Sequence, residues 1–128
     1  MQVYLNNAFS RFARRNDISA EELCEAVSRA ADGLIDARLG GGVIKQRIAR
    51  KGEGRSGGLR AMILFKEGKR AIFVHGFAKK DVGNIDGSEL QALKKLAKVM
   101  LAYSEAQIVS AVASGLLLEV RCDGKTIS

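Results

Sequence analysis

The pattern of apolar and polar positions divides the chain into a helical part, a strand-rich part and a second helical part. Near the start, apolar residues recur at helical spacing, first over residues 8–16 and again after Ser19 and Glu22, which have the spacing of a capping box. Gly33 is a suitable end for the second of these helices. We therefore expect a short strand at Val3–Leu5, followed by two short helices that form a hairpin.

The middle of the chain has the alternation and the β-branched residues that are typical of strands. Gly40–Gly42 interrupts the chain, and three strands are expected after it, at residues 43–50, 59–65 and 71–77. The first two are separated by a glycine-rich segment, Lys51–Gly58, which we expect to form a loop. Between the second and the third strand, Glu67 and Gly68 are expected to form a two-residue hairpin turn.

Helical spacing returns in the last third of the chain. Asp86 is the expected N-cap of a helix that continues to about Tyr103, and Ser104 with Gln107 has the spacing of a capping box that starts a separate helix. A last strand is expected at Leu116–Arg121. Because helices and strands are grouped rather than alternating, we expect an α+β fold. It would have a small antiparallel sheet with a mixed edge, an N-terminal helical hairpin packed on it, and C-terminal helices.

Length and composition narrow the classes of protein that fit. A chain of 128 residues suits a single domain, in which we expect residues 104–128 to form a C-terminal extension. No apolar run approaches the roughly 18 residues of a membrane span, so we expect a cytoplasmic protein with no membrane partner. Cys24 and Cys122 are far apart in the sequence and fit neither a zinc pattern nor a redox pattern, so we expect reduced thiols and no metal.

The positive charge is concentrated in one segment. The chain has a net charge of +7, and residues 43–80 hold eleven basic residues against two acidic ones, a local charge of +9. The remaining residues together carry −2. A concentrated basic surface is typical of proteins that bind a polyanion, usually nucleic acid, although solvated lysines that only keep a protein soluble would give the same count.

One motif in that segment matches a dinucleotide-binding pattern but lacks its context. Residues 52–57 read G-x-G-x-x-G, a motif that in dinucleotide-binding proteins precedes a helix and an acidic residue about twenty positions later. Here a strand is expected next, and Phe77 stands where the acid would be. We therefore expect neither a nucleotide nor any other cofactor, and interpret the segment as a loop that carries Lys51 and Arg55.

The predicted hairpin brings basic residues to one end of the sheet. With a two-residue turn, Arg60 would lie opposite His75 on one face. The glycine-rich loop with its two basic residues runs into the strand next to Arg60, and Lys79 and Lys80 leave the partner strand at the same end. Five or more cationic groups would then converge on one rim of the sheet.

Such a group of cations fits the cleavage of RNA without a metal. The reaction removes a proton from the 2′-OH, passes through a dianionic phosphorane and protonates the 5′-oxygen. Arginine can hold phosphate oxygens with its planar fork, and a lysine or His75 can transfer a proton. Phe77 can stack on a base. Structural roles for His75 and Phe77, and plain solvation for the lysines, stay open as alternatives.

Three segments together resemble a known family. They are Leu39–Arg60, which ends in Ser-Gly-Gly-Leu-Arg, Ile72–Lys80, which ends in Gly-Phe-Ala-Lys-Lys, and Asp86–Leu96. Over about residues 3–101 the sequence resembles the RelE/HigB superfamily of bacterial type II toxin–antitoxin toxins, and within it the RelE-like, HigB-type addiction-module killers. The resemblance implies an antiparallel sheet with a helical hairpin against it. It also implies metal-free cleavage of mRNA in the ribosomal A site, and a cognate antitoxin that masks the basic cleft.

The resemblance also implies roles for individual residues. By position, Arg60 is similar to the strand arginine of the family. With the other basic residues and His75, the expected catalytic set is Lys51, Arg55, Arg60, His75, Lys79 and Lys80, and the expected RNA contacts are Lys45, Arg47, Arg50 and Phe77. Many relatives end with a tyrosine or another catalytic group, which residues 104–121 lack. Two other functions stay open: a ParE-like toxin that inhibits a protein such as DNA gyrase, and a non-catalytic nucleic-acid-binding module.

Overall fold

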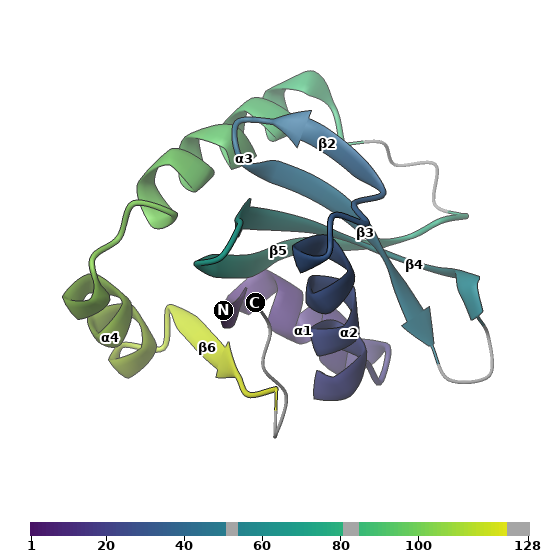
Figure 1. Cartoon of the computed structure of the whole chain (residues 1–128), viewed down its shortest axis with the longest axis horizontal. Coiled ribbons are helices and arrows are strands. Elements are labelled where there is room, and N and C mark those ends of the chain that lie inside the picture. Colours follow the sequence, from purple (N-terminus) through teal and green to yellow (C-terminus); the bar gives the residue numbers. More distant parts are fainter. Residues whose placement is uncertain (51–53, 81–84, 123–128) are drawn as a thin grey trace.

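The computed structural model describes residues 1–50, 54–80 and 85–122, with the backbone alone at residues 50 and 54–57. In these residues, six strands form one mixed sheet and four helices pack on it (Figure 1). The strands are β1 (Gln2–Asn6), β2 (Ala37–Gly40), β3 (Val43–Arg50), β4 (Gly54–Lys66), β5 (Arg70–Ala78) and β6 (Leu117–Val120). The helices are α1 (Asn7–Arg15), α2 (Ala20–Ala31), α3 (Gly87–Met100) and α4 (Glu105–Ala113). The expected α+β class is confirmed.

The strand order of the sheet is β2-β3-β4-β5-β1-β6. Neighbouring strands are antiparallel except β1, which lies parallel to β5. The first strand of the chain is therefore inserted between the central hairpin β4–β5 and the last strand, β6. As a result, β6 lies at one edge of the sheet and β2 at the other.

Each helix begins at a side chain that caps it. The predicted capping boxes at Ser19 and Ser104 are both formed, and Asp86 accepts a hydrogen bond from the backbone of Glu89 as the predicted N-cap of α3. Asn6, which the sequence analysis did not single out, caps α1 in the same way. Local side-chain chemistry thus sets where the helices start.

Helices α1 and α2 cover one face of the sheet, which we call the α1–α2 face. The ring of Phe9 lies 5.5 Å from that of Phe12 and 5.0 Å from that of Phe73 in β5, measured between centroids. Phe12 lies directly over Gly76, where a Cβ atom would overlap its ring. The close approach of α1 to the sheet therefore requires a glycine at this position.

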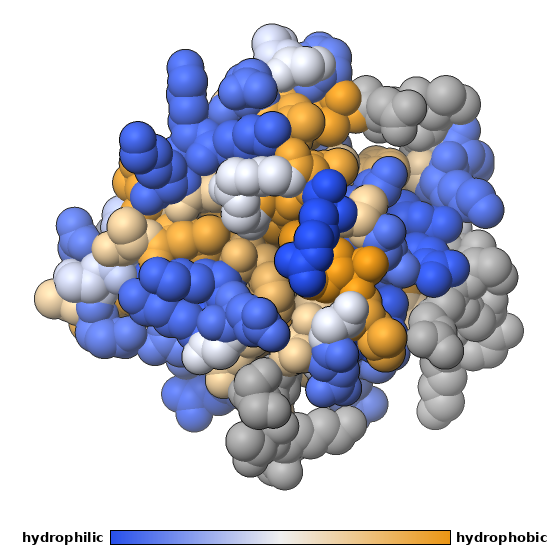
Figure 2. All heavy atoms as spheres, turned by 45° about the horizontal axis from the view of Figure 1, so that its top comes forward, coloured by the Kyte–Doolittle hydropathy of each residue, from blue (hydrophilic) through white to orange (hydrophobic). Residues whose placement is uncertain are grey.

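Helices α3 and α4 cover part of the opposite face, which we call the α3–α4 face. Met100 of α3 and Ile108 of α4 are buried in one cluster with Leu64 and Ile72 of the sheet. Viewed with the α3 side turned forward, apolar side chains gather in the middle of the molecule and hydrophilic ones surround them (Figure 2). The sheet is therefore a middle layer with an apolar core on each side.

A buried arginine fastens the junction of α3 and α4 to the sheet. Arg70, at the start of β5, has none of its surface exposed. Its guanidinium donates to the backbone carbonyls of Met100 and Tyr103, both at 3.0 Å, and lies 3.5 Å from the carboxylate of Glu105. The carbonyl of Met100 also accepts a hydrogen bond from the backbone N–H of Tyr103 at 3.3 Å, so Arg70 adds a second donor there and acts as a C-terminal cap supplied by the sheet.

Three local expectations were wrong. Strand β2 was not predicted, because Gly40–Gly42 looked like an interruption; all three glycines have positive φ and carry the chain from β2 into β3. The second half of the expected loop Lys51–Gly58 belongs to β4, which begins at Gly54. Helix α3 ends at Met100 rather than near Tyr103, where Arg70 takes up the carbonyls.

The expected register of the β4–β5 hairpin was also wrong. Lys66 pairs with Arg70 rather than with Lys69, so the turn has three residues, with Gly68 at φ +74°. This shift alone would move His75 to the other face from Arg60. The ladder shifts again between Met62 and Ile63, which leaves Val74 as an extra residue in β5 and places His75 opposite Met62.

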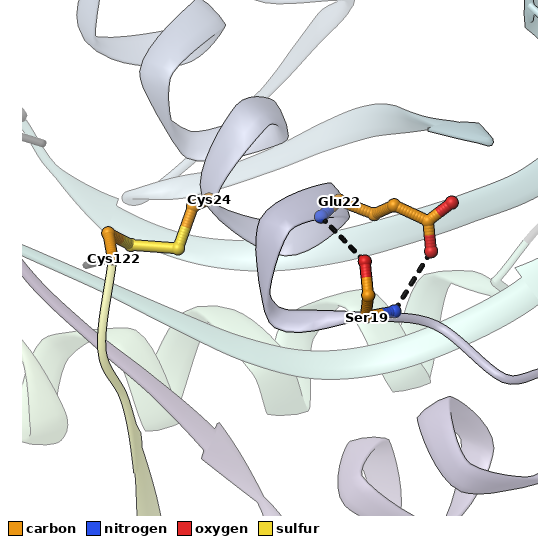
Figure 3. Close-up of a disulfide and its surroundings, with 4 residues drawn as sticks. All are labelled: Ser19, Glu22, Cys24 and Cys122. Atoms are coloured by element: carbon orange, nitrogen blue, oxygen red, sulfur yellow. Dashed lines mark hydrogen bonds between the residues drawn. A yellow bond between two sulfur atoms is a disulfide. The ribbon is translucent and has the colours of Figure 1, made fainter. Parts of the chain in front are cut away.

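The expectation of reduced thiols was wrong as well. Cys24, on α2, and Cys122, just after β6, form a disulfide with their Cα atoms 5.7 Å apart (Figure 3). The two residues are 98 positions apart in the sequence. Only the packing of the C-terminal strand against the N-terminal helices brings them together, and no local pattern records that packing.

Candidate nucleic-acid interface

Residues from three adjacent strands form two rows on the α3–α4 face, next to the buried row of Val43, Leu64 and Ile72. In the first row Arg47 pairs with Arg60, and Arg60 with Phe77. In the second row Met62 lies between Lys45 and His75. Residues directly opposite each other in a sheet point to the same face. We call the set Lys45, Arg47, Arg60, His75 and Phe77, all half-buried, the cationic patch.

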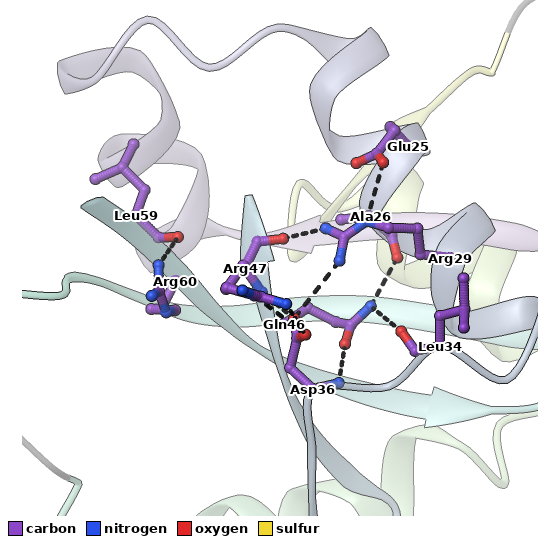
Figure 4. Close-up of polar contacts among 9 residues, drawn as sticks. All are labelled: Glu25, Ala26, Arg29, Leu34, Asp36, Gln46, Arg47, Leu59 and Arg60. Carbon is purple, nitrogen blue, oxygen red and sulfur yellow. Dashed lines mark hydrogen bonds and ion pairs between the residues drawn. The ribbon is translucent and has the colours of Figure 1, made fainter. Parts of the chain in front are cut away.

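Asp36 holds Arg47 in place at one side of the patch (Figure 4). Its carboxylate accepts hydrogen bonds from the backbone N–H of Arg47 at 2.7 Å and from the guanidinium at 3.0 and 3.2 Å. Burial alone would raise the pKa of Asp36, but the hydrogen bonds from Arg47 and the charges of Arg47 and Arg29 outweigh it, so this pKa is lowered. Arg47 is thereby oriented while 41% of its side chain stays exposed.

Arg60 occupies the centre of the first row. Its guanidinium donates to the carbonyl of Leu59 at 3.2 Å. Burial and the nearby charge of Arg47 lower the pKa of Arg60, and Asp36 opposes this shift. The guanidinium stays protonated all the same. Two arginines directly opposite each other on a sheet repel each other, so this pairing lowers stability unless an anion lies between them.

His75 and Phe77 border the cations on the β5 side. Their rings are stacked, with centroids 5.9 Å apart and an interplanar angle of 27°. Phe77 also packs against the second apolar core, which fixes its position. A group that can carry a proton and a flat apolar surface therefore lie beside the two arginines, which suits a nucleotide better than a simple anion.

The remaining predicted residues lie around the same end of the sheet or outside the described residues. Lys79 and Lys80 directly follow β5 and are exposed, and the backbone N–H of Lys79 donates to the carbonyl of Gly58 in β4. Arg50 ends β3 and Arg55 lies near the start of β4, but their side chains are not among those described. Lys51 lies outside the described residues.

A buried polar network behind Arg47 was missed at the level of sequence. The amide of Gln46, fully buried, donates to the carbonyls of Ala26 and Leu34 and accepts from the backbone N–H of Asp36 (Figure 4). The signal was present, because Gln46 stands between Ile44 and Ile48 on the buried side of the strand alternation. A polar side chain there needs partners.

Arg29 of α2 completes this network. Its guanidinium pairs with Glu25 at 2.9 Å, donates to the carbonyl of Arg47, and lies 3.5 Å from the carboxylate of Asp36. The helix on one face is thus connected to the strand that carries the patch on the other. The position of Arg47 therefore depends on helix α2 as well as on its own strand, β3.

The described ranges hold neither a cluster of metal-ligating side chains nor a single membrane-spanning helix. In residues 1–50, 54–80 and 85–122, no three His, Cys, Asp or Glu side chains come together in a way that could hold a metal ion. No single helix in these ranges is long and apolar enough to cross a membrane, and α3 and α4 reach the required length only as a pair bent by 115°.

Comparison with protein families decides what kind of protein carries this patch. The sequence matches the family described as the RelE toxin of the RelE/RelB toxin–antitoxin system over residues 1–120. The chain belongs to the RelE toxin family. The match extends through β6, beyond the segments on which the resemblance rested. Membership of the RelE family implies a partner antitoxin. A comparison with curated proteins gives no match.

Proposed function

We propose that this RelE-family chain is an endoribonuclease of a type II toxin–antitoxin system that cleaves mRNA in the ribosomal A site. The observation that carries the proposal is the alignment of Arg47, Arg60 and Phe77 across three strands, with His75 in the next row. The repulsion between the opposed arginines is relieved when a phosphate lies between them. A nucleotide supplies that phosphate and a base to stack on Phe77.

The proposed reaction uses the 2′-OH of the RNA as the nucleophile and needs no metal. A base removes the 2′-OH proton, the 2′-oxygen attacks the adjacent phosphorus, and the 5′-oxygen leaves with a proton from an acid. The products are a 2′,3′-cyclic phosphate and a 5′-OH end. Arg60 stabilises the charge of the phosphorane through its planar fork, which is present before the reaction begins.

The other residues take supporting roles in this proposal. Lys45 and Arg47 hold neighbouring phosphates, and Asp36 restricts Arg47 to an orientation that faces them. His75, Lys79 or Lys80 moves the protons. Lys51, Arg50 and Arg55 belong to the proposed set on the strength of their place in the sequence alone.

Expression in bacteria with primer extension on a translated reporter mRNA tests the proposal. The wild type should produce new 5′ ends within the reading frame, and Arg60→Ala should lose them, by roughly 100-fold or more if the guanidinium stabilises the phosphorane. Arg11→Ala is the matched control, since it removes an exposed arginine from α1, which covers the other face. A reporter without a start codon should stay intact if cleavage needs the ribosome.

Two results would contradict the proposal. Growth arrest with intact mRNA would point to a protein target, as for ParE-like toxins. Binding of RNA with a steep salt dependence and no cleavage would leave a nucleic-acid-binding module.

A further inference from the structure

The Cys24–Cys122 disulfide joins the C-terminal end of the sheet to α2 (Figure 3). The strand that leads to it, β6, has four residues and pairs with β1 alone among the described strands. Leu117 is its one fully buried side chain, while Leu118 is 40% exposed and Glu119 is exposed. Little packing therefore holds this strand, and the covalent bond at its end matters more than it would in a central strand.

A groove on the α1–α2 face explains why packing is weak there. The groove, of about 750 Å³, lies between α1, the start of α2 and the end of β6. Leu5, Ala13 and Leu23 form its apolar part, and residues 119–121 form the β6 side. Val120 and Cys122 are partly buried against the apolar core of this face, but Glu119 and Arg121 are exposed, so the wall made by residues 119–121 is packed less closely than the central strands.

The disulfide stands at the end of this wall. Leu23 and Arg121, which both line the groove, are the sequence neighbours of Cys24 and Cys122. The disulfide therefore holds the end of the groove wall to α2, where packing is weak. The cationic patch lies on the other face, on β3, β4 and β5, where apolar residues are buried on both sides of the sheet.

Burial makes one sulfur accessible before the other. Cys24 is 6% exposed, whereas Cys122 is half-buried. A thiolate from solution would attack Sγ of Cys122, form a mixed disulfide there, and release Cys24 as a thiolate that takes up a proton. A second thiol then frees Cys122, so that two low-molecular-weight thiols are oxidised to one disulfide while the protein gains two thiols.

We propose that this disulfide is a redox-sensitive latch on the C-terminal strand. When a low-molecular-weight thiol such as glutathione reduces it, β6 and the groove wall detach from the α1–α2 face, and the rest of the sheet, with the cationic patch, stays folded. The inference rests on the disulfide, the groove and the burial of β6, and is independent of the proposed ribonuclease function.

Hydrogen exchange followed by mass spectrometry tests the latch on the full chain, with and without dithiothreitol. On reduction, peptides that cover residues 117–122 should exchange at least about tenfold faster, and peptides from β4 less than about twofold faster. The melting temperature should fall by about 10 °C, because the bond joins residues 98 positions apart and so closes a long loop. The matched control is the double variant Cys24→Ala/Cys122→Ala. Its residues 117–122 should exchange rapidly, and dithiothreitol should not change their exchange rate.

Three outcomes would overturn the latch. Alkylation of the protein purified without reductant could find two free thiols, which would exclude the bond. Reduction could leave exchange at 117–122 unchanged, which would mean that packing alone holds β6. Reduction could instead abolish the near-ultraviolet circular dichroism of the whole protein, which would make the bond a requirement for the fold rather than a local latch.

Discussion

The two faces of the sheet use the same strands for different purposes. On the α1–α2 face, the rings of Phe9, Phe12 and Phe73 pack together, and α1 approaches so closely that Gly76 admits no side chain. On the α3–α4 face, the apolar rows stop at Met62, and cations follow. Over the central strands β4 and β5, the α1–α2 face is closed by packing, whereas the α3–α4 face is left half-covered at the end where its arginines face each other.

This difference separates residues that stabilise the fold from residues that lower its stability. A protein selected for stability alone would not place Arg47 opposite Arg60. Such local conflicts are expected where a structure has a function to perform. Substitutions in the packed apolar core should therefore lower stability, whereas substitution of Arg60 should lower activity while stability stays the same or rises.

The largest expected loss of stability comes from Arg70, which ties α3 and α4 to the sheet. Arg70→Met removes the hydrogen bonds that the guanidinium donates to the carbonyls of Met100 and Tyr103 and its ion pair with Glu105, and should lower the free energy of unfolding by about 3 kcal/mol. Urea denaturation measures this effect. Lys66→Met, which removes an exposed charge from the paired position, should stay within about 0.5 kcal/mol of the wild type. Equal losses of unfolding free energy in both variants would contradict the role of Arg70 as a cap for the α3–α4 junction.

The next largest loss is expected on the closed face. Gly76→Ala places a methyl group in the ring of Phe12, so α1 must shift, and the free energy of unfolding should fall by about 2 kcal/mol. Gly58→Ala is the matched control in the neighbouring strand, because nothing lies within 4 Å of a Cβ atom there. Thermal unfolding of the two variants tests this contrast, and a neutral Gly76→Ala would mean that α1 does not pack as closely as described.

The smallest effect is expected at Asp36, between the two faces. Its pKa is lower in the folded state than in the unfolded chain, so its ion pair stabilises the protein above about pH 4 and is lost as the pH falls through the folded-state value. Asp36→Asn should cost less than about 1 kcal/mol at neutral pH, and the difference from the wild type should shrink as the pH falls below about 4 and through the lowered folded-state pKa of Asp36. A difference that persists in acid would assign the effect to packing instead.

How much could be predicted from the sequence depended on the range of the interactions. Capping by Ser19, Asp86 and Ser104 involves neighbours three residues apart, so the helix starts were predicted correctly. The bulge at Val74 depends on the partner strand, and the sequence does not mark it. The expected end of α3 was wrong for a similar reason, because Arg70 lies 30 positions from the carbonyl of Met100 that it caps.

The sequence indicated which residues belong to the candidate site, but not how they pair across the strands. Residue chemistry and family resemblance selected Arg60, His75 and Phe77, and the structure places them in adjacent rows of one face. The expected pairing of Arg60 with His75 was wrong in register, yet the extra residue in β5 returned His75 to the same face. Asp36 escaped notice because its role appears only once the unpredicted strand β2 brings it beside Arg47.

We infer that the cationic patch carries the activity, whereas the apolar cores on the two faces of the sheet carry the fold. The most direct test of this inference measures cleavage of mRNA on translating ribosomes with purified wild type and Arg60→Ala, together with the melting temperature of each. We expect Arg60→Ala to lose cleavage by roughly 100-fold while its melting temperature is unchanged or higher. Cleavage at the rate of the wild type by a folded Arg60→Ala protein would contradict this inference.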